Sequence, residues 1–166
     1  MLVASMNPCP CGYYGSDKEC SCSNQAINKY LGKISGPLLD RIDIQVEVSS
    51  VKYKNLNSNT QEETSEQIRK RVEETRKIQL ERYKECGIYS NSELTPKLIE
   101  KYCKLDEKSK IILEKAFNKL GLSARAYARI LKVARTIADM DQSENIQSNH
   151  LLEAIQYRSL DKKYSR

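Results

Sequence analysis

Four cysteines lie close together near the N-terminus in two C-x-C pairs, Cys9 with Cys11 and Cys20 with Cys22, separated by eight residues. Two such pairs on a glycine-containing loop can direct four thiolates toward one tetrahedral centre, the geometry of structural Zn2+ at a Zn–S distance of about 2.3 Å. C-x-x-C is the commoner spacing, so redox-active thiols and unliganded loop cysteines stay open as alternatives. The pattern predicts a structural zinc site formed by these four residues.

Composition and charge narrow the class of protein. The chain has 166 residues, of which 39% are hydrophobic and 30% charged, which is typical of a globular protein. It has no apolar run of the roughly 20 residues that span a bilayer and no basic segment leading into a long apolar one. We therefore expect a soluble, cytoplasmic protein without a membrane partner. The net charge of +6 favours anionic partners, with nucleic acid and nucleotide phosphates as candidates.

Residues 1–50 have an α/β pattern. Apolar residues at 1–5 and the alternation of apolar and polar residues at 42–48 predict two strands, and residues 24–33 predict a helix between them. Two strands cannot bury both faces of a sheet without neighbours. We therefore expect this part to be the end of a larger core, with the chain truncated inside its first strand.

The rest of the chain has helical periodicity. A linker rich in serine and asparagine is expected at 51–60, followed by a helical domain at 61–166 with about five helices. The two other cysteines, Cys86 and Cys103, stand alone in helical patterns and are expected to pack in the core. The fold class predicted is mainly α with a small α/β N-terminal part. The residues expected to start or stop the helices are Gly87, Thr95 with Pro96, Asp106, Gly121, Ser123 and Ser148.

Three segments together resemble a known family. LVASMNPCPCGYYG, SGPLLDRIDIQVEV and LSARAYARILKVARTIADM occur in this order. They are similar to the C-terminal portion of the Mg-chelatase-like AAA+ ATPases, specifically the ComM competence-protein family. The resemblance extends over nearly the whole chain, and it implies the end of an AAA+ core followed by a helical lid.

The resemblance also implies roles for individual residues. Asn7 matches sensor 1, an amide that contacts the attacking water or the γ-phosphate, and Arg41 matches the arginine finger that reaches a neighbouring subunit's nucleotide. Arg125 matches sensor 2 at the start of a lid helix, with Arg129 one turn later as a second candidate for nucleotide binding. Asp40, next to the finger, is expected to position it or to pair across the interface. Without the resemblance, these residues indicate a turn, a surface ion pair and a solvated basic helix face.

Two motifs of the family do not occur here. The chain has no Walker A loop of the form G-x-x-x-x-G-K-[ST] and no Walker B strand, so we expect it not to hydrolyse ATP alone. For the complete protein, the resemblance implies ATP and Mg2+ as cofactors, a homo-hexamer, and DNA branch migration in competence and recombination. The alternatives are an ATPase subunit of a metal chelatase and a non-enzymatic, zinc-binding helical interaction module.

Overall fold

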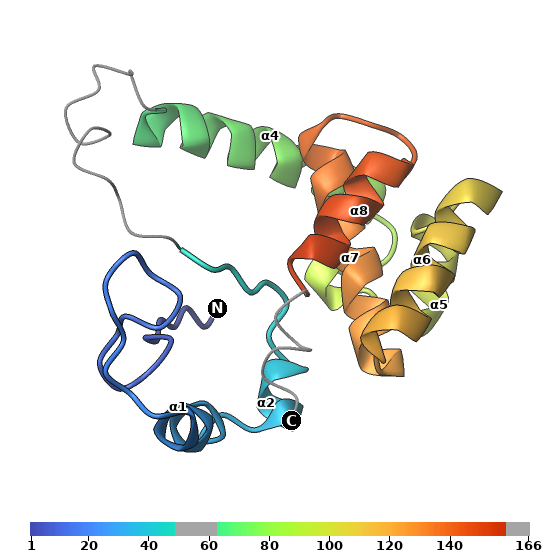
Figure 1. Ribbon diagram of the computed structural model, residues 1–166. Helices are drawn as coiled ribbons and strands as arrows, with labels where there is room; N and C mark the ends of the chain where they lie inside the picture. The colour runs from blue at the N-terminus through green and yellow to red at the C-terminus, as the bar shows by residue number, and fades with distance from the viewer. Residues whose placement is uncertain (49–62, 159–166) are drawn as a thin grey trace.

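The computed structural model describes residues 1–48 and 63–158, so the predicted linker at 51–60 lies outside the described residues. Within these ranges the chain forms seven α-helices and one short 3-10 helix, η1 (Asn91–Glu93). Figure 1 shows α5 to α8 grouped in a bundle, from which α4 extends away. The α-helices are α1 (Asn24–Leu31), α2 (Gly36–Leu39), α4 (Ser65–Arg82), α5 (Pro96–Tyr102), α6 (Glu107–Leu120), α7 (Ala124–Met140) and α8 (Ser148–Gln156).

Side-chain caps explain where the helices of the bundle begin. The Asp106 carboxylate accepts from the backbone N–H of Ser109 at the start of α6, and the Ser123 hydroxyl accepts from Ala126 at the start of α7. Each satisfies a backbone donor that has no partner inside the helix. At the other end of α6, Gly121 adopts φ 63°, a left-handed conformation that glycine takes without steric cost. The five helices predicted for this part are confirmed, and so are the boundaries at Asp106, Gly121 and Ser123. The expected stop at Gly87 is wrong, because α4 already ends at Arg82.

The prediction for the start of α8 is wrong by one residue. Ser148 is the first residue of the helix, and Gln147 precedes it as the cap. The backbone N–H of Gln147 donates to Nδ1 of His150 at 3.1 Å. The Ser148 hydroxyl is 3.1 Å from that of Ser109, so it joins α8 to α6 and does not cap its own helix.

Helix α7 is the centre of the hydrophobic core. It packs against α4, α5, α8 and η1, while α8 also packs against α6. Ile130, Leu131 and Ala134 of α7 are at most 3% exposed, and each isoleucine or leucine buried in this way contributes about 1.5–3 kcal/mol. Cys103 is buried in this core and Cys86 packs against it, as predicted. None of the helices in the described ranges has the length and hydropathy needed to cross a membrane.

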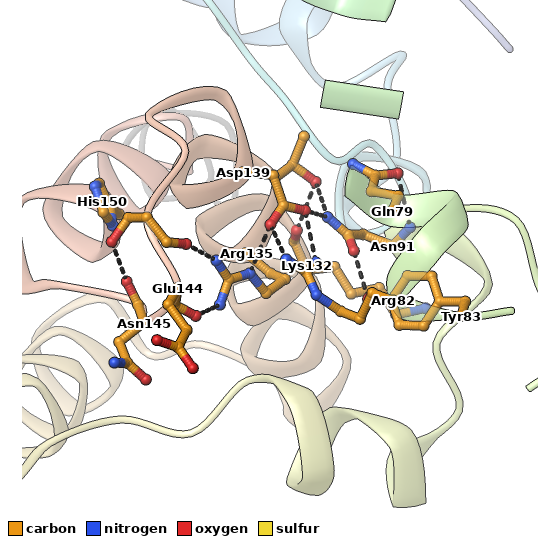
Figure 2. Close-up of polar contacts among 12 residues, drawn as sticks. Gln79, Arg82, Tyr83, Asn91, Lys132, Arg135, Asp139, Glu144, Asn145 and His150 are labelled. Atoms are coloured by element: carbon orange, nitrogen blue, oxygen red, sulfur yellow. Dashed lines mark hydrogen bonds and ion pairs between the residues drawn. The ribbon is translucent and has the colours of Figure 1, made fainter. Parts of the chain in front are cut away.

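A buried polar network joins α4 to α7 inside the bundle (Figure 2). The Asp139 carboxylate accepts two hydrogen bonds from Arg82 and one from Arg135 of its own helix. Asn91 of η1 donates to the same carboxylate at 2.8 Å and accepts from the Tyr83 hydroxyl. Buried charges are tolerated only when they are paired in this way. The network therefore fixes α4, η1 and α7 relative to one another.

The two strands predicted in the N-terminal part are not formed in the described residues. Neither 1–5 nor 42–48 pairs with another strand, whereas the helix predicted between them is present as α1. Val3 is 80% exposed, and Val46 and Val48 are 61% and 86% exposed. A segment with period-two alternation becomes a strand only when a neighbour supplies ladder hydrogen bonds and a surface to bury against. Instead, the backbone N–H of Gln45 donates to the carbonyl of Tyr157 at 3.0 Å.

Candidate functional site

The four N-terminal cysteines lie at one point, as their spacing predicts. The sulfur of Cys9 is 3.4 Å from that of Cys11 and 3.7 Å from that of Cys20, and Cys11 and Cys20 are 3.5 Å apart. All four sulfurs, that of Cys22 included, lie within 4.8 Å of one another. A tetrahedral site with Zn–S bonds of about 2.3 Å has S–S edges of about 3.8 Å. The donor set therefore fits a divalent cation such as zinc in number, chemistry and spacing.

The loop that carries the first pair is shaped by its backbone. The N–H of Gly12 donates to the Cys9 carbonyl and closes a turn, and Gly12 has φ 84°, which strongly favours glycine. The N–H of Tyr14 donates to the Cys9 sulfur at 3.4 Å. Such N–H···S bonds stabilise a thiolate and orient it toward a bound metal. Cys9 itself is buried, so its sulfur is shielded from solvent.

The acidities of the four thiols differ in a way that suits metal binding. A hydrogen bond from the backbone N–H of Tyr13 lowers the pKa of the Cys11 thiol to about 6. The backbone N–H of Cys22 lowers the pKa of Cys20, but burial and the neighbouring Cys11 and Cys9 sulfurs outweigh it and raise that pKa to about 12. Four neighbouring thiols cannot all ionise to thiolates without a cation, because like charges repel. A divalent cation removes this repulsion and displaces the remaining protons.

Arg41 lies just after α2 with its side chain exposed. Helix α2 is short, and its Ser35 cap followed by glycine and proline is a helix-start signal that the sequence-based predictions did not include. The Arg41 guanidinium donates to the Pro37 carbonyl one turn back at 2.8 Å. In this position the side chain faces solvent and is accessible to another molecule.

Asp40 connects the segment that follows α2 to the start of α7. Its carboxylate accepts from the Ser123 hydroxyl at 2.9 and 3.1 Å and from Arg125 at 3.5 Å. Asp40 also accepts from Arg158, which follows α8, at 3.4 Å. The predicted finger and the predicted sensor 2 thus come from segments that share one carboxylate, although 83 residues separate Asp40 from Ser123.

The other two predicted site residues fall into different groups. Arg129 pairs with the carboxylate of Asp43, so both arginines of the start of α7 contact the segment 40–43. Asn7 lies beside the cysteine loop, where a Cβ atom added at Gly12 would be 3.7 Å from its Nδ2. The roles of these residues in nucleotide binding and hydrolysis stay predictions, for Asn7, Arg41, Arg125 and Arg129 alike.

Asp43 and Arg158 also take part in the contacts between the segment 40–43 and the helices α7 and α8, although the sequence did not predict them as members. Asp43 lies within the alternating apolar and polar pattern at 42–48, and Arg158 comes after an amphipathic helix. Neither residue therefore stands out by type or spacing. The one signal in the sequence was the pair of acidic residues Asp40 and Asp43 close to Arg41, which indicates that this segment can pair with arginines. Its partners on α7 and after α8 become visible only when the chain is folded.

Two family models match this chain. The model described as "Magnesium chelatase, subunit ChlI C-terminal" matches residues 62–158, more than half of the chain. The model described as "Magnesium chelatase, subunit ChlI" matches residues 1–56. The first covers the helical bundle, and the second covers the cysteine loop, α1, α2 and Arg41.

Curated relatives agree with these models. The chain is 48% identical over 160 residues to "Competence protein ComM" of Haemophilus influenzae, covering 96% of this chain and 30% of that protein. It is 39% identical over 162 residues to "Uncharacterized protein YifB" of Escherichia coli, covering 97% of this chain and 31% of that protein. The chain thus spans about a third of the length of these relatives. It belongs to the Mg-chelatase ChlI-like family of AAA+ proteins and is a homologue of ComM.

Proposed function

We propose that this chain is the C-terminal region of a ring-forming AAA+ ATPase motor that acts on DNA. The complete ATPase, meaning this region joined to the Walker A and Walker B segments that the family resemblance implies, binds ATP and Mg2+ between subunits. In it, Asn7 serves as sensor 1, Arg41 as the finger toward the neighbouring subunit, and Arg125 as sensor 2. The observation that carries this proposal is the 48% identity to ComM across 96% of the chain.

The geometry supports the assignment of the two arginines. Arg41 is exposed on a short turn, which suits a residue that must reach outside its own subunit. Arg125 lies in the first turn of α7, where backbone N–H groups and the helix dipole favour an anion. Its side chain is 55% exposed, so a phosphate can compete with Asp40 for it.

DNA is the proposed substrate because a close relative carries the name competence protein and because the chain is basic. The alternative is a motor for metal insertion, which the magnesium chelatase family models favour. Binding of the complete ATPase to a branched DNA, measured by fluorescence anisotropy over a salt series, separates the two. A DNA motor binds with an affinity that falls steeply with salt. A chelatase motor shows no such binding and copurifies with tetrapyrrole enzymes.

The cysteine cluster is proposed to hold one structural zinc. Zn2+ bound by four thiolates has no open position, so it supplies folding energy to the loop and no chemistry. Residues that would hold it are Cys9, Cys11, Cys20 and Cys22. The loop they form precedes α1 and the turn that presents Arg41, so the metal would stabilise the N-terminal part.

Changing all four of these cysteines to serine should abolish metal binding, because serine does not replace thiolate as a zinc ligand. We expect about one zinc per chain in the unchanged protein and none in the variant, by elemental analysis after purification in reductant without chelator. Cys86→Ser is the matched control, since that cysteine lies in the helical bundle, and it should retain the metal. Unchanged protein without metal, or equal loss in the control, would contradict the zinc site.

Arg125→Ala in the complete ATPase should weaken ATP binding on the order of 10- to 100-fold, since it removes a charge-assisted hydrogen bond to phosphate. The measurement is titration with a fluorescent ATP analogue at fixed Mg2+. Arg129→Ala is the control, because that side chain is more shielded and already paired with Asp43, and its effect should be smaller. Unchanged ATP affinity and turnover in the Arg125 variant would exclude this residue from the site.

A further inference from the structure

Arg158 is the largest fully buried side chain in the part of the chain that the structure describes. It is the second residue after the end of α8, and it is 1% exposed. Burial of a guanidinium is costly unless the group is paired and hydrogen-bonded. A buried arginine at the end of a helix therefore indicates a fixed set of partners.

Two partners of Arg158 flank Arg41. Its Nη1 donates to the carbonyl of Ile42, and its Nη2 lies 3.4 Å from the Asp40 carboxylate. The preceding residue, Tyr157, accepts a hydrogen bond through its carbonyl from the backbone N–H of Gln45 at 3.0 Å. The end of α8 thus holds the segment 40–45 at three points, across 116 residues of sequence at the contact with Ile42.

These contacts fix the backbone on both sides of Arg41, but they do not involve the Arg41 side chain. Arg41 stands between the two residues that Arg158 holds, yet its own guanidinium is exposed. A group that must reach a phosphate on another subunit needs this combination, because a misplacement of about 1 Å at such a group can cost 100-fold in rate. Asp40 also accepts from Ser123 and Arg125, so the same carboxylate is shared by the start of α7.

We propose that Arg158 is a positioning residue for Arg41: it holds the turn that carries the finger against the end of α8, so that the helical domain and the finger move together. This inference rests on the proposed function of Arg41. It gives the end of α8 a role in turnover that acts through the position of Arg41 and needs no contact between α8 and the nucleotide. Movement of α7 and α8 on nucleotide binding would then shift the finger that the subunit presents to its neighbour.

The first test uses hydrogen exchange of the 166-residue chain. Arg158→Met keeps the apolar stem and removes the donors, and it should speed exchange of the Gln45 amide and of the amides at 41 and 42 by at least about tenfold. Amides in the middle of α7 should keep their rates. Arg135→Met is the matched control, since Arg135 is also buried and donates to two carbonyls, those of Ser143 and Glu144. It should perturb the bundle more than it perturbs the amides at 41, 42 and 45.

The second test uses turnover by the complete ATPase. Arg158→Met should lower kcat by about 10- to 100-fold with the KM for ATP changed less than about threefold. Arg158→Lys, which keeps the charge and one donor position, should restore part of the rate. In the Arg41→Ala background, Arg158→Met should cause no further loss, because a positioning effect disappears when the positioned group is absent.

Three outcomes would overturn the inference. These are unchanged exchange at 41, 42 and 45 in Arg158→Met, an unchanged kcat, or a loss that adds fully to that of Arg41→Ala. Normal turnover by Arg41→Ala alone would instead overturn the proposed function. The exchange rates would then still decide whether Arg158 holds the segment.

Discussion

Replacing Arg41 by alanine is expected to lower kcat of the complete ATPase by about 10³- to 10⁵-fold, the range that arginine fingers contribute. The affinity for ATP should change by less than about threefold, because the finger acts on charge that develops during phosphoryl transfer. The measurements are steady-state hydrolysis with a coupled assay and nucleotide binding by titration. The guanidinium is exposed and donates to the Pro37 carbonyl of its own turn, which makes a folding defect a poor explanation for such a loss.

An exposed arginine elsewhere supplies the control for this prediction. Arg69 lies on the surface of α4, outside the cluster formed by Asp40, Ser123 and Arg125. Arg69→Ala should leave hydrolysis in the absence of DNA unchanged. If Arg41→Ala lost binding and turnover to the same extent, the residue would have a structural role instead.

Asp139→Asn is expected to destabilise the helical bundle by about 3–5 kcal/mol, because it leaves the buried charge of Arg135 and the partly buried charge of Arg82 without a counter-ion. For a domain of this size, the melting temperature should fall by more than about 10 °C. The measurement is thermal unfolding of the 166-residue chain followed by circular dichroism at about 222 nm. The Asp139 side chain is fully buried, so solvent cannot compensate for the lost charge.

Glu63→Gln is the matched control for this prediction. Glu63 also accepts two hydrogen bonds from one arginine, Arg71, but both side chains are more than 40% exposed. Exposed pairs contribute at most about 1 kcal/mol, so the control should melt within a few degrees of the unchanged chain. Equal effects of the two substitutions would show that burial does not determine the strength of the Asp139 network.

Local signals in the sequence predicted the helical bundle well. Asp106, Ser123 and Gly121 mark helix ends through short-range hydrogen bonds and backbone conformation, which depend only on neighbouring residues. The Asp139 network was not predictable in the same way. Asp139 is 57 residues from Arg82 and 48 residues from Asn91, and an amphipathic pattern does not identify which polar residue turns inward.

The candidate site was predictable to a different extent in its two parts. The spacing of Cys9, Cys11, Cys20 and Cys22 predicted their convergence, because both pairs belong to one short loop. The family resemblance drew attention to Arg41 and Arg125, but their connection through Asp40 and Arg158 depends on how α7 and α8 pack. The two predicted strands also depended on distant partners. A local pattern does not contain the neighbouring strands that strand formation needs, so the prediction was wrong.

The most direct test of the proposed motor is a mixing experiment with two inactive forms of the complete ATPase. One form carries Arg41→Ala, and the other carries an alanine in place of the Walker A lysine but keeps Arg41. In a ring whose fingers act on the neighbouring subunit, mixing restores interfaces at which an intact phosphate loop meets an intact finger. A random one-to-one mixture should recover roughly a quarter of the unchanged rate. Affinity capture of a tagged subunit verifies that the rings are mixed. If the mixed rings stay as inactive as either form alone, that result contradicts the proposed action of Arg41 on a neighbouring subunit.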